Sequence, residues 1–171
     1  MTPVDLTSMT VEVVAQFDAP PPAVWALLTD VERMAGLGPE HFRAEWLTPA
    51  PAVGARFRGW NRAGDLEWAV ICVVTAFEPP RFIEWNVGEG PLPSSTWSYE
   101  LVPRAGDSST VTQRFRHGPG TSGVSAAVER YPERADAIVR RRSDTLRANM
   151  VVTLEAAARL IGGSGSAQDP T

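Results

Sequence analysis

The alternation of apolar and polar residues predicts seven strands. In residues 11–17, Val11, Val13, Ala15 and Phe17 share one face, which is the two-residue period of a half-buried strand. The same period recurs later in the chain, at residues 42–46, 55–61, 66–77, 82–87, 96–102 and 110–117. Short turns separate these segments, so we expect neighbouring strands to pair antiparallel.

A helical period replaces this alternation near the end of the chain and predicts one continuous helix over residues 132–161. Pro132 suits a first helical turn, and Gly162 and Gly163 follow the last one. One face of this helix is mostly apolar and consists of Ala135, Ile138, Val139, Leu146, Met150, Thr153, Leu154, Ala157 and Ile161. Arg142 falls within that face, and Asn149 lies at its edge. Small side chains together with an arginine suggest that the helix closes a cavity.

The remaining segments complete a single α+β domain. Two short helices are predicted after the first strand, over residues 23–28 and 30–35. Residues 1–9 are expected to be a flexible lead-in, residues 10–161 the domain, and the glycine- and serine-rich residues 162–171 a disordered tail. Because only the long helix can cover the sheet, we expect the sheet and this helix to enclose the interior.

Composition excludes several classes of function. A net charge of −4 without a basic patch argues against nucleic acid as a partner. No apolar stretch reaches the roughly 20 residues of a membrane span, and no signal peptide is recognisable. Cys72 is the single cysteine and cannot form an intrachain disulfide, which fits a reducing compartment. We therefore expect a cytoplasmic protein.

Metal and nucleotide sites are not expected either. His41, His117 and Cys72 have no metal-ligand spacing. Residues 118–123 match G-x-G-x-x-G, but a dinucleotide site also needs a parallel strand after the helix. No such strand is predicted, so this segment is interpreted as a loop at the mouth of the cavity, and no cofactor is predicted.

Tryptophans are the first candidates for ligand contact. Trp46, Trp68, Trp85 and Trp97 fall on inward strand faces, whereas Trp60 faces outward. Core packing is sufficient to account for any one of them. The four together predict the aromatic wall of a pocket, the usual form of a site for an apolar small molecule.

Polar residues beside these rings are the candidates for chemistry. Arg142 reaches solvent if the helix register shifts by one residue or if its side chain extends to the domain edge; otherwise it enters the cavity, where it can bind a carboxylate or an enolate. Tyr99 and His117 are the candidates for proton transfer, with His117 at the rim. The complete set of predicted ligand contacts is Trp46, Asn61, Trp68, Trp85, Trp97, Tyr99, Gln113, Leu146, Asn149 and Met150.

Three segments resemble a known superfamily: the run from Ala19 to Asp30, Val53–Gly59 and Glu78–Phe82. They are similar to the helix-grip proteins, also called START-like or SRPBCC, which include the Bet v 1 allergens. The bacterial polyketide cyclase/dehydrase branch is the most similar. The resemblance implies a curved seven-stranded antiparallel sheet around the long C-terminal helix, with a cavity for a polyketide-like or lipid-like molecule. The catalytic arginine of the cyclase branch cannot be placed on a matching motif here, so no catalytic residue is carried over.

Three functions follow as hypotheses. The first is a protein that binds an apolar or aromatic small molecule. The second is a polyketide cyclase or dehydratase in which Arg142 stabilises an enolate while Tyr99 or His117 moves protons. The third is a co-chaperone-like or regulatory partner protein, which requires an apolar patch on the outer face near Val14 and Trp60. Because no acid/base pair can be assigned, binding is favoured. The oligomeric state and the ligand stay open.

Overall fold

A computed structural model describes residues 4–162, 167 and 168. One antiparallel sheet runs through it in the order β2-β3-β4-β5-β6-β7-β1-β8. Its strands are β1 Thr10–Phe17, β2 His41–Trp46, β3 Arg56–Ala63, β4 Leu66–Glu78, β5 Phe82–Val87, β6 Ser95–Arg104, β7 Ser108–His117 and β8 Ala167–Gln168. Short turns join β3 through β7 in chain order, as the alternating pattern predicted.

The prediction of seven strands was wrong by one. β8 lies in the tail and pairs with the outer edge of β1, Val14 opposite Gln168 and Ala15 opposite Ala167. Two residues are too few to show an alternating pattern, so only the neighbouring strand defines β8. Of the tail predicted to be disordered, residues 163–166 and 169–171 lie outside the described residues.

The helices are η1 Leu6–Ser8, α1 Pro21–Leu28, α2 Val31–Met34, α3 Gly123–Arg130, η2 Pro132–Arg134 and α4 Ala135–Leu160. The predicted long helix is therefore a short 3-10 turn followed by α4. α3 was not predicted. Ser122 begins it with a capping box, in which its hydroxyl accepts from the Ser125 amide and Ser125 Oγ accepts from the Ser122 amide. Tyr131 separates α3 from η2 because its backbone leaves the helical region.

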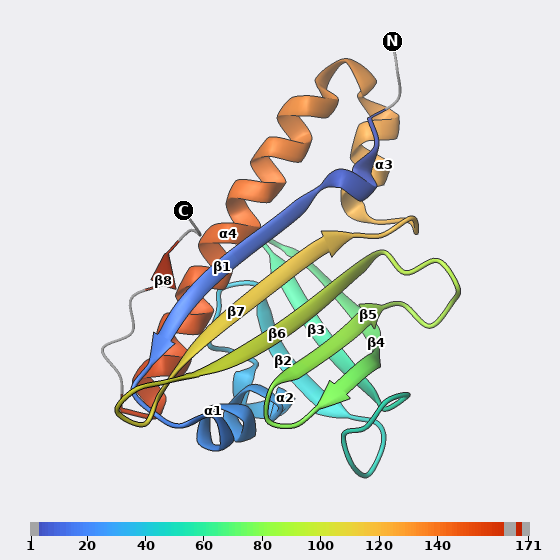
Figure 1. Ribbon diagram of the computed structural model, residues 1–171. Coiled ribbons are helices and arrows are strands. Elements are labelled where there is room, and N and C mark those ends of the chain that lie inside the picture. Colours follow the sequence, from blue (N-terminus) through green and yellow to red (C-terminus); the bar gives the residue numbers. More distant parts are fainter. Residues whose placement is uncertain (1–3, 163–166, 169–171) are drawn as a thin grey trace.

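In Figure 1 the sheet curves around α4, which runs alongside β1. α1 and α2 lie below one end of the sheet, and α3 packs beside the N-terminal part of α4. Two irregularities in strand pairing contribute to the curvature, between His41 and Arg43 in β2 and between Val74 and Ala76 in β4. The concave face of the sheet is thereby turned toward α4.

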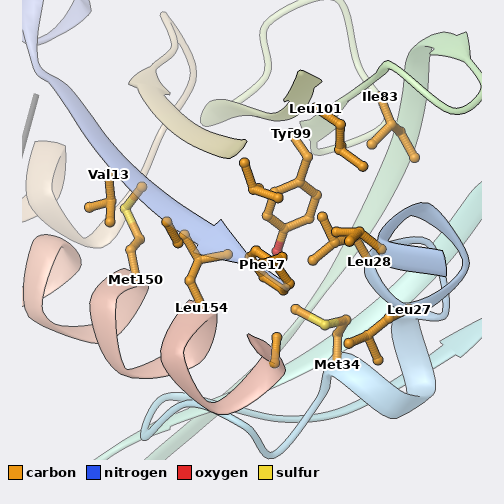
Figure 2. Packing of buried hydrophobic residues seen from close by; sticks show 14 of the residues in the cluster. Val13, Phe17, Leu27, Leu28, Met34, Ile83, Tyr99, Leu101, Met150 and Leu154 are labelled. Atoms are coloured by element: carbon orange, nitrogen blue, oxygen red, sulfur yellow. The ribbon is translucent and has the colours of Figure 1, made fainter. Parts of the chain in front are cut away.

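The core is tightest where β1, β6 and β7 meet the C-terminal half of α4. Phe17, Leu101, Val111 and Leu154 are at most 1% exposed. Figure 2 shows the Tyr99 ring among these residues, with its hydroxyl end directed toward Phe17. Complete burial of a leucine or phenylalanine side chain contributes about 1.5–3 kcal/mol. This half of the interior therefore stabilises the fold.

Candidate ligand-binding site

The four predicted tryptophans lie on the inner face of the sheet. Trp85 pairs with Trp97 on one side and with Val74 on the other, and Trp46 pairs with Phe57. Each of these residues alternates with outward-facing neighbours along its own strand. Trp68 shares this face because it pairs with Asn61. All four rings are only half-buried, although they face inward. The interior between β2–β5 and α4 is therefore less closely filled than the core beside β1.

Aromatic rings form a continuous row across this part of the sheet. Ring centroids are 5.3 Å apart for Trp46 and Phe57, 6.0 Å for Phe57 and Trp85, and 5.4 Å for Trp85 and Tyr99. The rings are tilted or edge-on to one another, which suits their quadrupoles. The row thus offers an extended apolar surface that runs from β2 to β6.

A buried polar pair ends the row. Gln113 Nε2 donates to the Tyr99 hydroxyl at 3.5 Å, whereas Gln113 Oε1 has no partner among the described residues. Burial raises the pKa of Tyr99 well above its ordinary value, so the phenol keeps its proton at neutral pH. An unpaired buried oxygen costs about 1–3 kcal/mol. Gln113 and Tyr99 thus place hydrogen-bonding capacity within an otherwise apolar region.

His41 is a second buried polar group and was not among the predicted site residues. Its Nε2 has no hydrogen-bond partner in the described part of the chain. The imidazole lies against Gly59, where an added Cβ would be 3.1 Å from Nε2. Burial lowers the pKa of His41, which keeps the ring neutral at pH 7. The place of His41 is clear only in the structure, where it begins β2 opposite Asn61, which is itself half-buried on the inner face.

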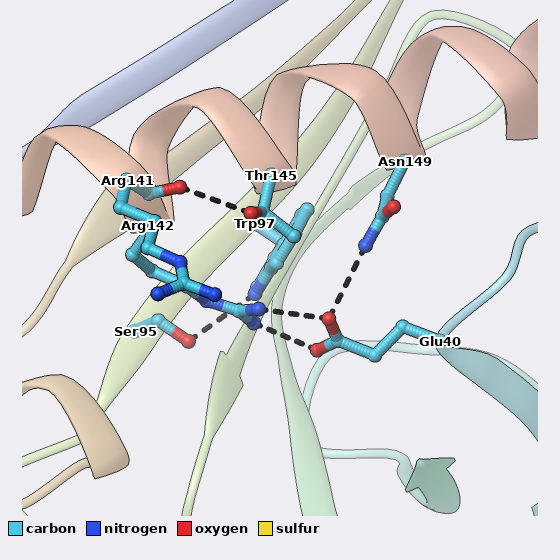
Figure 3. A network of polar contacts seen from close by, with 7 residues as sticks. All are labelled: Glu40, Ser95, Trp97, Arg141, Arg142, Thr145 and Asn149. Atoms are coloured by element: carbon cyan, nitrogen blue, oxygen red, sulfur yellow. Dashed lines mark hydrogen bonds and ion pairs between the residues drawn. The ribbon is translucent and has the colours of Figure 1, made fainter. Parts of the chain in front are cut away.

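Arg142 forms an ion pair across the gap between α4 and β2. Its Nη1 and Nη2 donate to Glu40 Oε2 and Oε1 at 2.8 and 2.7 Å, and Asn149 Nδ2 donates to Oε2 at 3.2 Å. Figure 3 shows both side chains extending from α4 toward Glu40. The Arg142 side chain is 30% exposed and that of Glu40 16%. Glu40 escaped prediction because it lies in a loop without any periodic pattern.

Two surface depressions accompany these groups. One, of about 320 Å³, is lined by Pro39, Glu40, Arg62, Ala63, Gly64, Thr145 and Asn149. The other, of about 490 Å³, lies near α1 and is lined by Pro21, Pro80, Arg81, Glu100, Leu101, Val102 and Pro103. Neither is lined by the four tryptophans. A cavity enclosed by those rings therefore stays a prediction.

The other predicted site residues differ in their surroundings. Leu146 and Met150 are buried in the core. His117 is buried, and both its ring nitrogens are engaged, Nδ1 with the Gly118 carbonyl and Nε2 with Ser122 Oγ, each at 2.7 Å. Since a carbonyl only accepts, Nδ1 donates, and in the neutral ring Nε2 accepts from the Ser122 hydroxyl. His117 thus holds the loop before α3, and its role in proton transfer stays a prediction.

A concave antiparallel sheet closed by one long C-terminal helix defines the helix-grip class of proteins. Residues 8–151 match the family described as polyketide cyclase / dehydrase and lipid transport. The chain belongs to this family.

Solved structures share the fold. The Polyketide_cyc-like protein Cgl2372 from Corynebacterium glutamicum is 24% identical, with a TM-score of 0.65 over 90% of this chain and 91% of that one. The Zhui aromatase/cyclase from Streptomyces sp. R1128 is 15% identical, with a TM-score of 0.67 over 89% and 92%. Protein Ms6760 from Mycobacterium smegmatis is 18% identical, with a TM-score of 0.64 over 93% and 94%. A comparison with curated protein sequences finds no match. Among the described residues, no helix is both long and apolar enough to cross a membrane.

Proposed function

We propose that this protein binds an apolar or aromatic small molecule between the inner face of its sheet and α4. The row of rings from Trp46 to Tyr99 carries the proposal, because its inward-facing tryptophans remain half-buried. Apolar surface of this kind is usually covered by a ligand or a partner. Family membership supports the same function, since the family description includes lipid transport.

The buried polar groups support a ligand that is not purely hydrocarbon. Gln113 Oε1 and His41 Nε2 both lack protein partners among the described residues. A ligand with one or two polar atoms satisfies such groups, as in most small-molecule sites. The ligand is therefore a polyketide-like or lipid-like molecule with polar substituents.

Cyclase or dehydratase activity is the second candidate, and it is favoured by the family description and by the likeness to the Zhui aromatase/cyclase. The surroundings of Arg142 argue against this activity. Both ends of the guanidinium are bound to Glu40, so stabilising an enolate would first require this ion pair to open. Binding is the preferred function, because it needs neither an enolate-stabilising cation nor a group that transfers protons, and both ring nitrogens of His117 are already engaged.

The hypothesis of a regulatory partner protein receives less support. Trp60, its best outward-facing residue, is covered by the Arg43 and Arg58 guanidinium groups, 4.2 and 5.6 Å from the ring centroid. Val14 is half-buried on β1 opposite Gln168 of β8. Neither residue offers the broad apolar patch that docking of a protein partner requires.

Binding of methyl 2-naphthoate, a neutral aromatic probe, tests the proposed function. We expect quenching of tryptophan fluorescence and a concentration-dependent rise in melting temperature. Trp85→Leu removes the central ring of the row and should weaken binding about 3- to 10-fold, the value of one aromatic contact. Trp60→Leu, on the outer face, is the matched control and should leave affinity unchanged. Equal affinities in both variants, or no binding to the wild type, would contradict the proposal.

A further inference from the structure

Three hydrogen-bond donors from α4 converge on the carboxylate of Glu40. Arg142 supplies two of them in a bidentate arrangement, and Asn149 supplies the third at 3.2 Å. A planar guanidinium with a neighbouring amide is well suited to recognise a carboxylate. The donors belong to one rigid helix, whereas the acceptor comes from a loop side chain. The donors on α4 can therefore bind the carboxylate of another molecule in the same geometry as that of Glu40.

Glu40 can withdraw its side chain without unfolding the loop. Its backbone carbonyl accepts from the Arg62 amide at 2.9 Å, and the next carbonyl, that of His41, accepts from the Gly36 amide at 2.8 Å. These bonds hold the backbone independently of the carboxylate. A rotation about the side-chain bonds of Glu40 is thus sufficient to free Arg142 and Asn149.

A second cation is available to receive the released carboxylate. Arg62 and Glu40 line the same depression of about 320 Å³. The Arg62 guanidinium lies over the Phe42 ring at 5.1 Å, and within the described residues it forms no ion pair with an acidic side chain. The Glu40–Arg142 pair is mostly buried, and the net contribution of such a pair to stability is limited because the desolvation of both charges offsets their attraction. Exchange of one carboxylate for another is therefore energetically accessible.

We propose that Arg142 and Asn149 form a carboxylate-binding site which Glu40 occupies when the protein is empty, and that the ligand is an apolar or aromatic carboxylic acid. This inference rests on the proposed function. Arg142 lies four residues before the buried Leu146 and Asn149 three residues after it, so both share a helix face with this leucine. Figure 3 shows Trp97 lying behind the ion pair. A carboxylate bound by Arg142 thus places the attached apolar body toward the aromatic interior.

Two substitutions with opposite expected effects test the exchange. The probes are 2-naphthoate and its neutral methyl ester, and calorimetry measures the affinity of each. Glu40→Gln removes the competing charge and should raise the affinity for 2-naphthoate about 3- to 10-fold. Arg142→Met should lower it about 10-fold or more, the size of a lost charge-assisted pair. The ester should respond by less than about 2-fold to either change, since it carries no charge.

Matched controls come from the outer face of β2 and β3. Glu45 on β2 pairs with Arg43 and Arg58 at 3.5 and 3.7 Å. Glu45→Gln and Arg58→Met reproduce the chemical changes away from α4 and should leave the ratio of acid to ester affinity unaltered. If Glu40→Gln does not fold, Glu40→Asp weakens the same ion pair by shortening the side chain and should also favour the acid.

The outcomes separate this inference from the proposed function. A loss of 2-naphthoate affinity in Glu40→Gln, or no change, would show that Glu40 is structural and overturn the carboxylate site. Binding of the ester with no selective effect of Arg142→Met on the acid would overturn it too, while the proposed function stands. Failure of both probes to bind the wild type and every variant would remove the proposed function itself.

Discussion

The two halves of the interior differ in how completely their side chains are buried. In the closed half, β1 and the adjoining parts of β6 and β7 meet the C-terminal half of α4, and Phe17, Leu101 and Leu154 are at most 1% exposed. In the open half, β2–β5 face the N-terminal half of α4, and inward rings such as Trp46 and Trp85 remain half-buried. The open half contains larger side chains than the closed half and yet buries them less completely.

The helix itself accounts for this difference. Ala157 and Ala158 are completely buried, so the C-terminal half of α4 can approach the sheet closely. Arg142 and Asn149, nearer its N-terminus, instead contact Glu40 through polar bonds. Small side chains near the C-terminal end of α4 thus close a core, whereas polar side chains nearer its N-terminus contact the loop that carries Glu40. The residues of α4 that stabilise the core and those that belong to the candidate site therefore lie in different parts of the same helix.

The largest expected effect tests the closed half. Leu154→Ala should lower the free energy of unfolding by about 2–5 kcal/mol, because it leaves a cavity at a completely buried position. Leu160→Ala, on the same helix but 50% exposed, should change it by about 0.5 kcal/mol or less. Urea denaturation measures both. Similar values for the two variants would show that the closed half is not the tighter region.

A smaller effect is expected at the seam between α4 and the loop before β2. A Cβ on Gly38 would lie 2.2 Å from Thr153 Oγ1, whose hydroxyl donates to the Asn149 carbonyl. Gly38→Ala should therefore destabilise the protein by about 1–2 kcal/mol through overpacking. Thermal denaturation would detect this as a lowered melting temperature.

A second substitution shows whether that loss arises from the contact. Thr153→Ala removes the clashing oxygen, so Gly38→Ala should cost clearly less in its presence, as a double-mutant cycle measures. Gly90→Ala is the control, since nothing lies within 4 Å of a Cβ there. Additive effects of the two substitutions would mean that the loop does not touch Thr153 in solution.

The smallest effect concerns pH and the buried imidazole of the open half. Burial lowers the pKa of His41 in the folded protein below its ordinary 6.5. The unfolded chain therefore binds more protons between the two values, and stability falls as pH drops below about 6.5. Glu40, the neighbouring carboxylate, opposes the shift. Because a single titrating group contributes at most about 1.4 kcal/mol per pH unit, the expected slope lies below this value.

His41→Gln should flatten this dependence below about pH 6.5 without altering it at higher pH. Denaturation at several pH values, with wild type and variant compared at each, isolates the contribution of His41 from that of other groups. An identical pH dependence in the two proteins would place His41 in contact with water and remove it from the buried part of the site.

Local patterns were sufficient for most of the secondary structure. β5 has the predicted bounds, and the ends of β1 and β4 differ from prediction by one residue. A strand with one buried face must alternate, so the strand and its inward face could be inferred together. α3 was not predicted, because its eight residues are too few to show a sustained helical period. The capping box of Ser122 and Ser125 that begins α3 is a finding of the structure.

Alternation and helical periodicity are properties of neighbouring residues, so they were enough to predict which faces turn inward. The sequence also marked Arg142 as an exception within an apolar stripe. Only the tertiary structure decided what that exception means, since Glu40 is 102 residues away in the chain and no local pattern connects the two. Partners of buried polar groups are chosen by the path of the whole chain. For that reason the inward faces of the four tryptophans could be predicted from the sequence, while Glu40 and His41 became visible only in the fold.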